Sequence, residues 1–171
     1  MRTRITIKAG FLIAAAAVLH VIESWLPVPI PIPGVKLGLA NIVTVVALLW
    51  LGRGMAMSIA IGRVLIASLI GGSLMGPSFV MSLAGAITSL FVMDYSFRYG
   101  SRYFSVVGVS VIGATFHALS QLFIAALLVS SLSVLWYIPW LMVFAVPTGI
   151  VTGVAASFFL HHTAKVTFFD K

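Results

Sequence analysis

The sequence predicts an all-α, polytopic membrane protein with six transmembrane helices and both termini in the cytoplasm. Three observations lead to this fold class. Hydrophobic residues make up 61% of the 171 positions and charged residues only 8%, whereas soluble domains are typically about 25% charged. The apolar residues form six stretches that approach the length needed to cross a bilayer. The positive charges gather at alternate connections between those stretches, as they do in cytoplasmic loops.

The residues between the six stretches are of the types that interrupt helices. The proline-rich segment 27–33 ends the first helix, because proline lacks the backbone N–H that a helix interior requires. The segments 52–54 and 75–77 contain glycine or proline and predict tight connections. Segment 94–102 is a polar stretch that separates the fourth and fifth helices. The predicted spans form a single domain over residues 1–171 and are 7–26, 37–51, 55–74, 78–93, 104–129 and 140–160.

Charge and hydropathy restrict both topology and function. A mean hydropathy of +1.20 excludes a soluble enzyme, a nucleic-acid-binding domain and a disordered chain. The net charge of +7 is therefore interpreted as the excess of positive residues in cytoplasmic loops rather than as a nucleic-acid-binding surface. A cleavable signal peptide ending near residues 14–17 is an alternative, but its removal would leave five spans and mix the charges. With six spans, Lys36 stands alone on the outer side and Arg63 lies inside the third span. The inner side carries Arg2, Arg4, Lys8, Arg53, Arg98, Arg102, Lys165 and Lys171.

Polar side chains enter five of the spans between the middle and the outer end. Arg63 lies about 12 Å along the third span at 1.5 Å per residue. His20 and Glu23 share a helix face at i,i+3, and His117 and Gln121 share one at i,i+4. Polar groups at such depths are functional candidates, and their one-sided distribution indicates a site open to the outside rather than a channel. The predicted substrate-binding residues are Glu23, Lys36, Asn41, Arg63, Ser82, His117 and Gln121.

The charges of this set indicate the kind of solute. Lys36 and Arg63 outweigh Glu23, so the expected ligand is small and anionic, with an apolar body that matches the walls. A metal site built from His20, Glu23 and His117 is an alternative, but the two cations would repel a metal ion. Structural roles are alternatives to ligand binding for these residues. Arg63 and Glu23 could neutralise each other, and Asn41 and Gln121 could join helices by hydrogen bonds. Lys36 could extend to the membrane interface.

Two further segments carry predicted roles. Pro29, Pro31 and Pro33 alternate with branched aliphatic residues, which predicts a stiff, extended segment outside the membrane. Such a segment would serve either as a lid over the site or as a spacer between two helices.

Small residues mark close helix contacts, and Gly149-x3-Gly153 is one such pattern. Another lies in the inner half of the first span, where a partner subunit could dock, and consists of Gly10, Ala14 and Ala17.

Several segments resemble a known family. The block 33–44 reads Pro-Gly-Val-Lys-Leu-Gly-Leu-Ala-Asn-Ile-Val-Thr and is preceded by Ile22-Glu23-Ser24. These residues resemble the signature of the Gx transporter proteins, which are also labelled heptaprenyl diphosphate synthase component I. The likeness covers nearly the whole chain and departs from the usual Asn-Leu-Gly at Ala118-Leu119-Ser120. Further matching segments are 63–65, 82–85, 113–122 and 148–153.

This family is similar to the substrate-binding S components of energy-coupling factor transporters. The resemblance implies a multi-pass subunit of a bacterial or archaeal cytoplasmic membrane that captures a solute from outside. It also implies that the first outer loop is a lid and that the small-residue stripe on the first helix meets a transmembrane coupling subunit. Two ATPase subunits would supply the energy, since the chain itself has no Gly-x4-Gly-Lys-Ser/Thr nucleotide-binding loop.

The synthase label implies an alternative, a membrane accessory subunit of polyprenyl or quinone synthesis. We do not expect the chain to be an enzyme, because prenyl synthases hold magnesium diphosphate with clustered carboxylates. The only carboxylates are Glu23, Asp94 and Asp170, and no two are close in sequence. A structural membrane subunit without a ligand is a third hypothesis. We expect no cofactor, no resident metal and no nucleic-acid partner, and we expect contact with membrane lipid.

Overall fold

The computed structural model describes residues 2–25, 38–100 and 102–166 and forms an all-helical protein, which confirms the all-α part of the predicted fold class. No strand occurs within these ranges. The predicted lid residues Pro29, Pro31 and Pro33 and the predicted ligand residue Lys36 lie outside them. The elements are α1 (Arg2–Trp25), α2 (Leu39–Leu51), α3 (Arg53–Ile70), α4 (Pro77–Gly100), α5 (Val106–Val129), the 3-10 helix η1 (Leu132–Tyr137) and α6 (Ile138–Val166).

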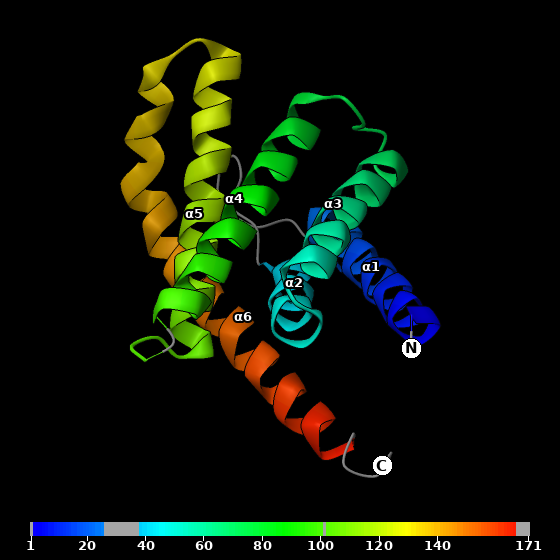
Figure 1. Ribbon diagram of the computed structural model, residues 1–171. Coiled ribbons are helices and arrows are strands. Elements are labelled where there is room, and N and C mark those ends of the chain that lie inside the picture. The colour runs from blue at the N-terminus through cyan, green and yellow to red at the C-terminus, as the bar shows by residue number, and fades with distance from the viewer. Residues whose placement is uncertain (1, 26–37, 101, 167–171) are drawn as a thin grey trace.

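The helices form two groups that meet at the middle of the molecule (Figure 1). In one group α5 packs between α4 and α6, and in the other α1, α2 and α3 pack together. Contacts of α2 with α6 and of α3 with α4 join the groups. The start of α1, the end of α6 and the α2–α3 and α4–α5 connections lie toward the lower side of Figure 1. The α3–α4 and α5–α6 connections lie at the opposite side, so successive helices run in alternating directions.

The lengths and surfaces of the helices are those of a membrane protein. Four helical segments are long and apolar enough to cross a bilayer: Arg53–Ile70, Pro77–Gly100, Val106–Val129 and Leu132–His162. Two shorter apolar segments are Ala9–Glu23 and Leu39–Leu51. Large apolar side chains cover the outward faces, which a soluble protein avoids but a lipid environment favours. Examples are Phe11, Leu69, Phe123, Leu127, Val154 and Phe158.

The ends of α3 and α4 differ from the ends of the predicted spans. The third helix ends at Ile70 rather than at 74. A backbone turn follows it at 71–72, and both Gly72 and Met75 take positive φ angles. The fourth continues to Gly100 rather than ending at 93, so most of the polar stretch 94–102 is helical. Asp94 is neutralised within this part of the helix: Arg98, four residues later, donates from Nε to Asp94 Oδ1 at 3.0 Å.

The predicted close contact at Gly149 and Gly153 is confirmed. A Cβ atom added at Gly149 would lie 2.5 Å from Cα of Val111, and one at Gly153 would lie 2.6 Å from Cα of Val107. Both glycines therefore let the backbones of α5 and α6 approach directly, as small residues do at membrane helix contacts. This contact fixes the wall of the pocket described next, because both helices contribute residues to it.

Candidate functional site

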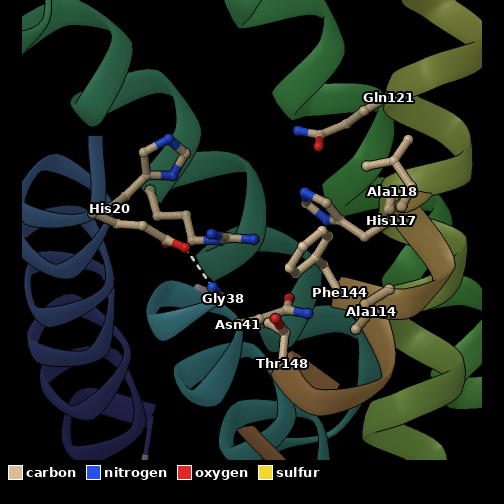
Figure 2. Close-up of a pocket in the computed structure, with 13 residues that line it drawn as sticks. His20, Gly38, Asn41, Ala114, His117, Ala118, Gln121, Phe144 and Thr148 are labelled. Carbon is tan, nitrogen blue, oxygen red and sulfur yellow. Dashed lines mark hydrogen bonds between the residues drawn. The ribbon is translucent and has the colours of Figure 1, made fainter. Parts of the chain in front are cut away.

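A pocket lies between the two groups of helices and takes side chains from α1, α2, α3, α5 and α6 (Figure 2). It encloses about 610 Å³ of space between protein atoms, part of which is open to the exterior. Figure 2 shows His20 on one side and His117 and Gln121 on the other, with Gly38, Asn41 and Thr148 below. The lining residues are His20, Glu23, Gly38, Asn41, Arg63, Ala114, His117, Ala118, Gln121, Leu141, Phe144, Ala145 and Thr148.

The N-terminus of α2 opens into this pocket. The helix has 13 residues and is therefore about 20 Å long, shorter than the hydrocarbon core of about 30 Å. It ends at Leu51, beside the α2–α3 connection at the lower side of Figure 1, so its first turn starts at depth within the protein. Gly38, which precedes that turn, donates its N–H to Oε1 of Glu23 on α1. Helix N-termini carry a partial positive charge and favour anions, and at this N-terminus the anion is the carboxylate of Glu23.

Gly38 fits this position because it has no side chain. Its φ of 75° lies in the left-handed region, where a Cβ atom is strained. A Cβ atom there would also approach Cγ2 of Thr148 to 2.9 Å and Oγ1 of Thr152 to 3.2 Å. Oγ1 of Thr152 donates to the Gly38 carbonyl at 3.5 Å, so α2 and α6 meet at this residue. The start of α2 is thus held between Glu23 on one side and α6 on the other.

We expect Gly38→Ala to destabilise the fold by about 2–4 kcal/mol, because left-handed strain of about 1–2 kcal/mol adds to an overpacked contact. Gly72→Ala is the matched control, since Gly72 has a φ of 64° but no atom within 4 Å of the added Cβ. Thermal unfolding of the purified variants measures both effects. Equal losses of stability in the two variants would show that the contact with α6 contributes nothing.

Arg63 supplies the positive charge of the pocket. It lies on α3, is 3% exposed and interacts electrostatically with Glu23. Within the described ranges its Nε and Nη2 atoms are buried and have no hydrogen-bond partner. An arginine in so apolar a setting needs its donors satisfied, because an unmade hydrogen bond to a charged group is costly. A bound anion would meet that need, and a guanidinium presents its donors in a planar fork that fits a carboxylate or phosphate.

Two amides complete the polar lining. Asn41 on α2 is 6% exposed and Gln121 on α5 is 3% exposed. In the part of the chain that the structure describes, the buried Oδ1 of Asn41 and Oε1 of Gln121 have no donor. Gly85 on α4 makes room for the α5 side chains, because a Cβ atom there would lie 3.0 Å from both Gln121 and His117. These amides can orient a ligand that carries hydroxyl or N–H donors.

The structure brings together most of the predicted binding residues. Glu23, Asn41, Arg63, His117 and Gln121 all line one pocket, and His20, which shares a face with Glu23, joins them. Ser82 is 4% exposed on α4 but does not line this pocket. Of the predicted docking stripe, Gly10 and Ala14 are exposed and Ala17 is buried at 2%. Among the described residues no three His, Asp or Glu side chains lie close enough to hold a metal ion, so the three-ligand alternative is not formed.

Part of the lining was missed by reasoning from the sequence. Thr148 had a usable signal, because it is polar within an apolar helix and follows Pro147, the proline inside α6. Gly38 belonged to the quoted block 33–44 but no role was assigned to it. Phe144 and Leu141 had no signal, because an apolar residue in an apolar helix looks the same whether it faces lipid or a pocket.

Comparison with known families gives one match. Residues 12–159 match the family model described as heptaprenyl diphosphate synthase component I. This range includes every pocket residue named above. No curated protein and no solved structure matches the chain.

Proposed function

The chain belongs to the heptaprenyl diphosphate synthase component I family, and we propose that it is a solute-binding membrane subunit of an energy-coupling-factor-type importer. Its pocket captures a small, anionic and partly apolar solute. The role is not enzymatic. Of the aspartates, Asp94 is held by Arg53 and Arg98 and is not a pocket residue.

One observation carries this proposal: a buried arginine faces a pocket and, among the described residues, its Nε and Nη2 have no hydrogen-bond partner. The N-terminus of α2 begins at the same pocket, where the Gly38 N–H donates to Glu23. Alanine, leucine and phenylalanine side chains form the remaining walls. Few polar groups placed in a mostly apolar cavity are typical of small-molecule sites. A short helix that begins at a ligand is also the arrangement that membrane transporters use for anionic groups.

We further propose that all six helices cross the membrane and that both termini are cytoplasmic. The alternating directions of the helices support an even number of crossings (Figure 1). Arg53 and Arg98 both contact Asp94, so the α2–α3 connection and the end of α4 lie on one side, which the charge rule assigns to the cytoplasm. The short α2 is compatible with this topology because its first turn lies against a cavity rather than against lipid.

In this proposal the energy comes from a transmembrane coupling subunit and ATPase subunits. The exposed small residues Gly10 and Ala14 on α1 are the candidate contact with the coupling subunit, because small side chains let a partner helix approach closely. The segment of Pro29, Pro31 and Pro33 joins α1 to α2 in sequence, and both helices line the pocket. The segment is therefore suited to act as the lid.

A non-catalytic membrane accessory subunit of polyprenyl or quinone synthesis is the second candidate function. The family description favours it, because "component I" of a synthase implies a partner subunit. The mostly apolar pocket would then accept an isoprenoid or quinone precursor with an acidic head. The two functions differ in the expected partners: a soluble prenyl synthase in one, and coupling and ATPase subunits in the other.

Native mass spectrometry of the gently purified protein tests the proposal. We expect a bound anionic small molecule in the wild type. Occupancy should be about tenfold lower in Asn41→Leu, since a ligand donor that loses the Oδ1 acceptor and stays buried costs about 1–3 kcal/mol. The matched control is Ser89→Ala, which alters a buried polar residue outside the pocket. An empty protein that instead carries a prenyl synthase would support the accessory-subunit function and contradict the importer.

A further inference from the structure

A second cluster of charges lies at the start of α3, ten residues before Arg63. Asp94 on α4 is 8% exposed and contacts two arginines: Arg98 at 3.0 Å and Arg53, the first residue of α3, at 3.6 Å. The side chains of Arg53 and Arg98 remain 46% and 58% exposed. Arg102, just beyond the end of α4, is also exposed. Two cations on one buried carboxylate leave a net positive charge, and the carboxylate holds both guanidinium groups in place.

Aromatic side chains surround this cluster. The guanidinium carbon of Arg53 lies 4.7 Å from the ring centroid of Phe91, a cation–π contact. The rings of Tyr95 and Tyr99 lie 4.7 Å apart on α4, and both are strongly exposed, at 65% and 74%. Exposed tyrosines gather at the level of lipid headgroups in membrane proteins. In a bilayer, tyrosines at the headgroup level would place the neighbouring arginines at the depth of the phosphate groups.

A groove leads from this cluster toward the hydrocarbon. Its polar end is lined by Arg53, Asp94 and Arg98, and its apolar part by Val92 and by Phe116 on α5. Phe116 is ten residues into α5, which places it about 15 Å from the start of that helix. A ligand that fills the groove thus has a negative head at the arginines and an apolar chain along the aromatic rings. A lipid of the surrounding membrane has this shape.

We propose that this groove, at the junction of α3, α4 and α5, binds an anionic glycerophospholipid whose phosphate is held by Arg53 and Arg98. Basic pockets between helices on the cytoplasmic side of membrane proteins recognise such headgroups. The exposed guanidinium groups can donate hydrogen bonds to a phosphate, and Asp94 restricts the conformations of both arginine side chains. The site is separate from the solute pocket, with which it shares no residue. It depends on the membrane location of the protein but not on import.

The test is native mass spectrometry of delipidated protein titrated with dioleoyl phosphatidylglycerol or with dioleoyl phosphatidylcholine. We expect one phosphatidylglycerol to bind at least about tenfold more tightly than phosphatidylcholine, because charge-assisted hydrogen bonds exceed neutral ones. The triple variant Arg53→Gln, Asp94→Asn, Arg98→Gln should lose this preference. It removes the carboxylate together with its partners, so that no unpaired charge is left buried. Circular dichroism and thermal unfolding check that the variant is folded.

Lys165→Gln is the matched control, because it removes one cation from the last turns of α6. An equal loss in this control would show diffuse charge attraction and overturn the proposal. Equal binding of the two lipids by the wild type would also overturn it. If the triple variant does not fold, Arg53→Lys with Arg98→Lys replaces it: the charge stays, the planar fork is lost and affinity should fall. Displacement of the lipid by inorganic phosphate or by a prenyl diphosphate at equal concentration would assign the groove to those ligands instead.

Discussion

Replacing Arg63 with alanine should weaken binding of the anionic solute at least about 100-fold and abolish uptake by cells that contain the complete importer. Two charge-assisted hydrogen bonds from the guanidinium, each contributing about 1.5–3 kcal/mol, account for an effect of this size. The Nε and Nη2 atoms are the donors concerned, because within the described ranges they are buried and have no partner. Ligand occupancy in native mass spectra and uptake of the identified solute measure the two losses.

Loss of binding in Arg63→Ala has a second explanation, which the next variants exclude. Arg63 interacts electrostatically with the buried Glu23, and a buried charge that loses its partner destabilises a protein by about 3–5 kcal/mol. In the double variant Glu23→Gln, Arg63→Gln no charge remains, so the fold should be retained while binding is still lost. Arg63→Lys keeps the charge but loses the planar fork, and we expect intermediate affinity.

These variants separate a binding role of Arg63 from a structural one. If Arg63 only neutralises Glu23, the double variant will bind the solute as the wild type does. Wild-type affinity in that variant, with normal thermal stability, would contradict the assignment of Arg63 to the ligand.

The helical class and the convergence of polar residues were predictable from sequence, for physical reasons. A bilayer has no water to satisfy polar groups, so an arginine within an apolar helix indicates a protein-lined site even without knowledge of the packing. Arg63, Asn41, His117 and Gln121 could be assigned on that basis, and the structure brings them to one pocket.

The remaining features depend on contacts between helices, which periodicity does not encode. The C-terminal part of α4 carries Asp94, which is neutralised by two arginines, one of which comes from α3. The role of Gly38 depends on Thr148 and Thr152, more than a hundred residues later. Ser82 has the depth expected of a site residue, but α4 does not contribute to the pocket. Depth along a helix can thus be estimated from sequence, whereas the direction of a side chain around the helix requires the packing.

Gly149→Ala should destabilise the protein by about 3 kcal/mol and lower its midpoint of thermal unfolding. A single methyl group has this effect because the added Cβ would lie 2.5 Å from Cα and 3.0 Å from N of Val111. These are backbone atoms, so no change of rotamer relieves the overlap. The helices α5 and α6 must separate, and overpacking in well-packed contacts costs about 1–3 kcal/mol or somewhat more. Because both helices line the pocket, affinity for the solute should fall as well.

Gly10→Ala is the matched control for this prediction. Gly10 also lies within a helix, but no atom lies within 4 Å of the added Cβ. Alanine is favoured over glycine in a helix interior by about 1 kcal/mol, so this variant should be as stable as the wild type or slightly more stable. The comparison therefore isolates the α5–α6 contact from the general effect of replacing glycine. Equal unfolding temperatures for the two variants would show that the helices can separate at no cost, and the close approach would then not stabilise the fold.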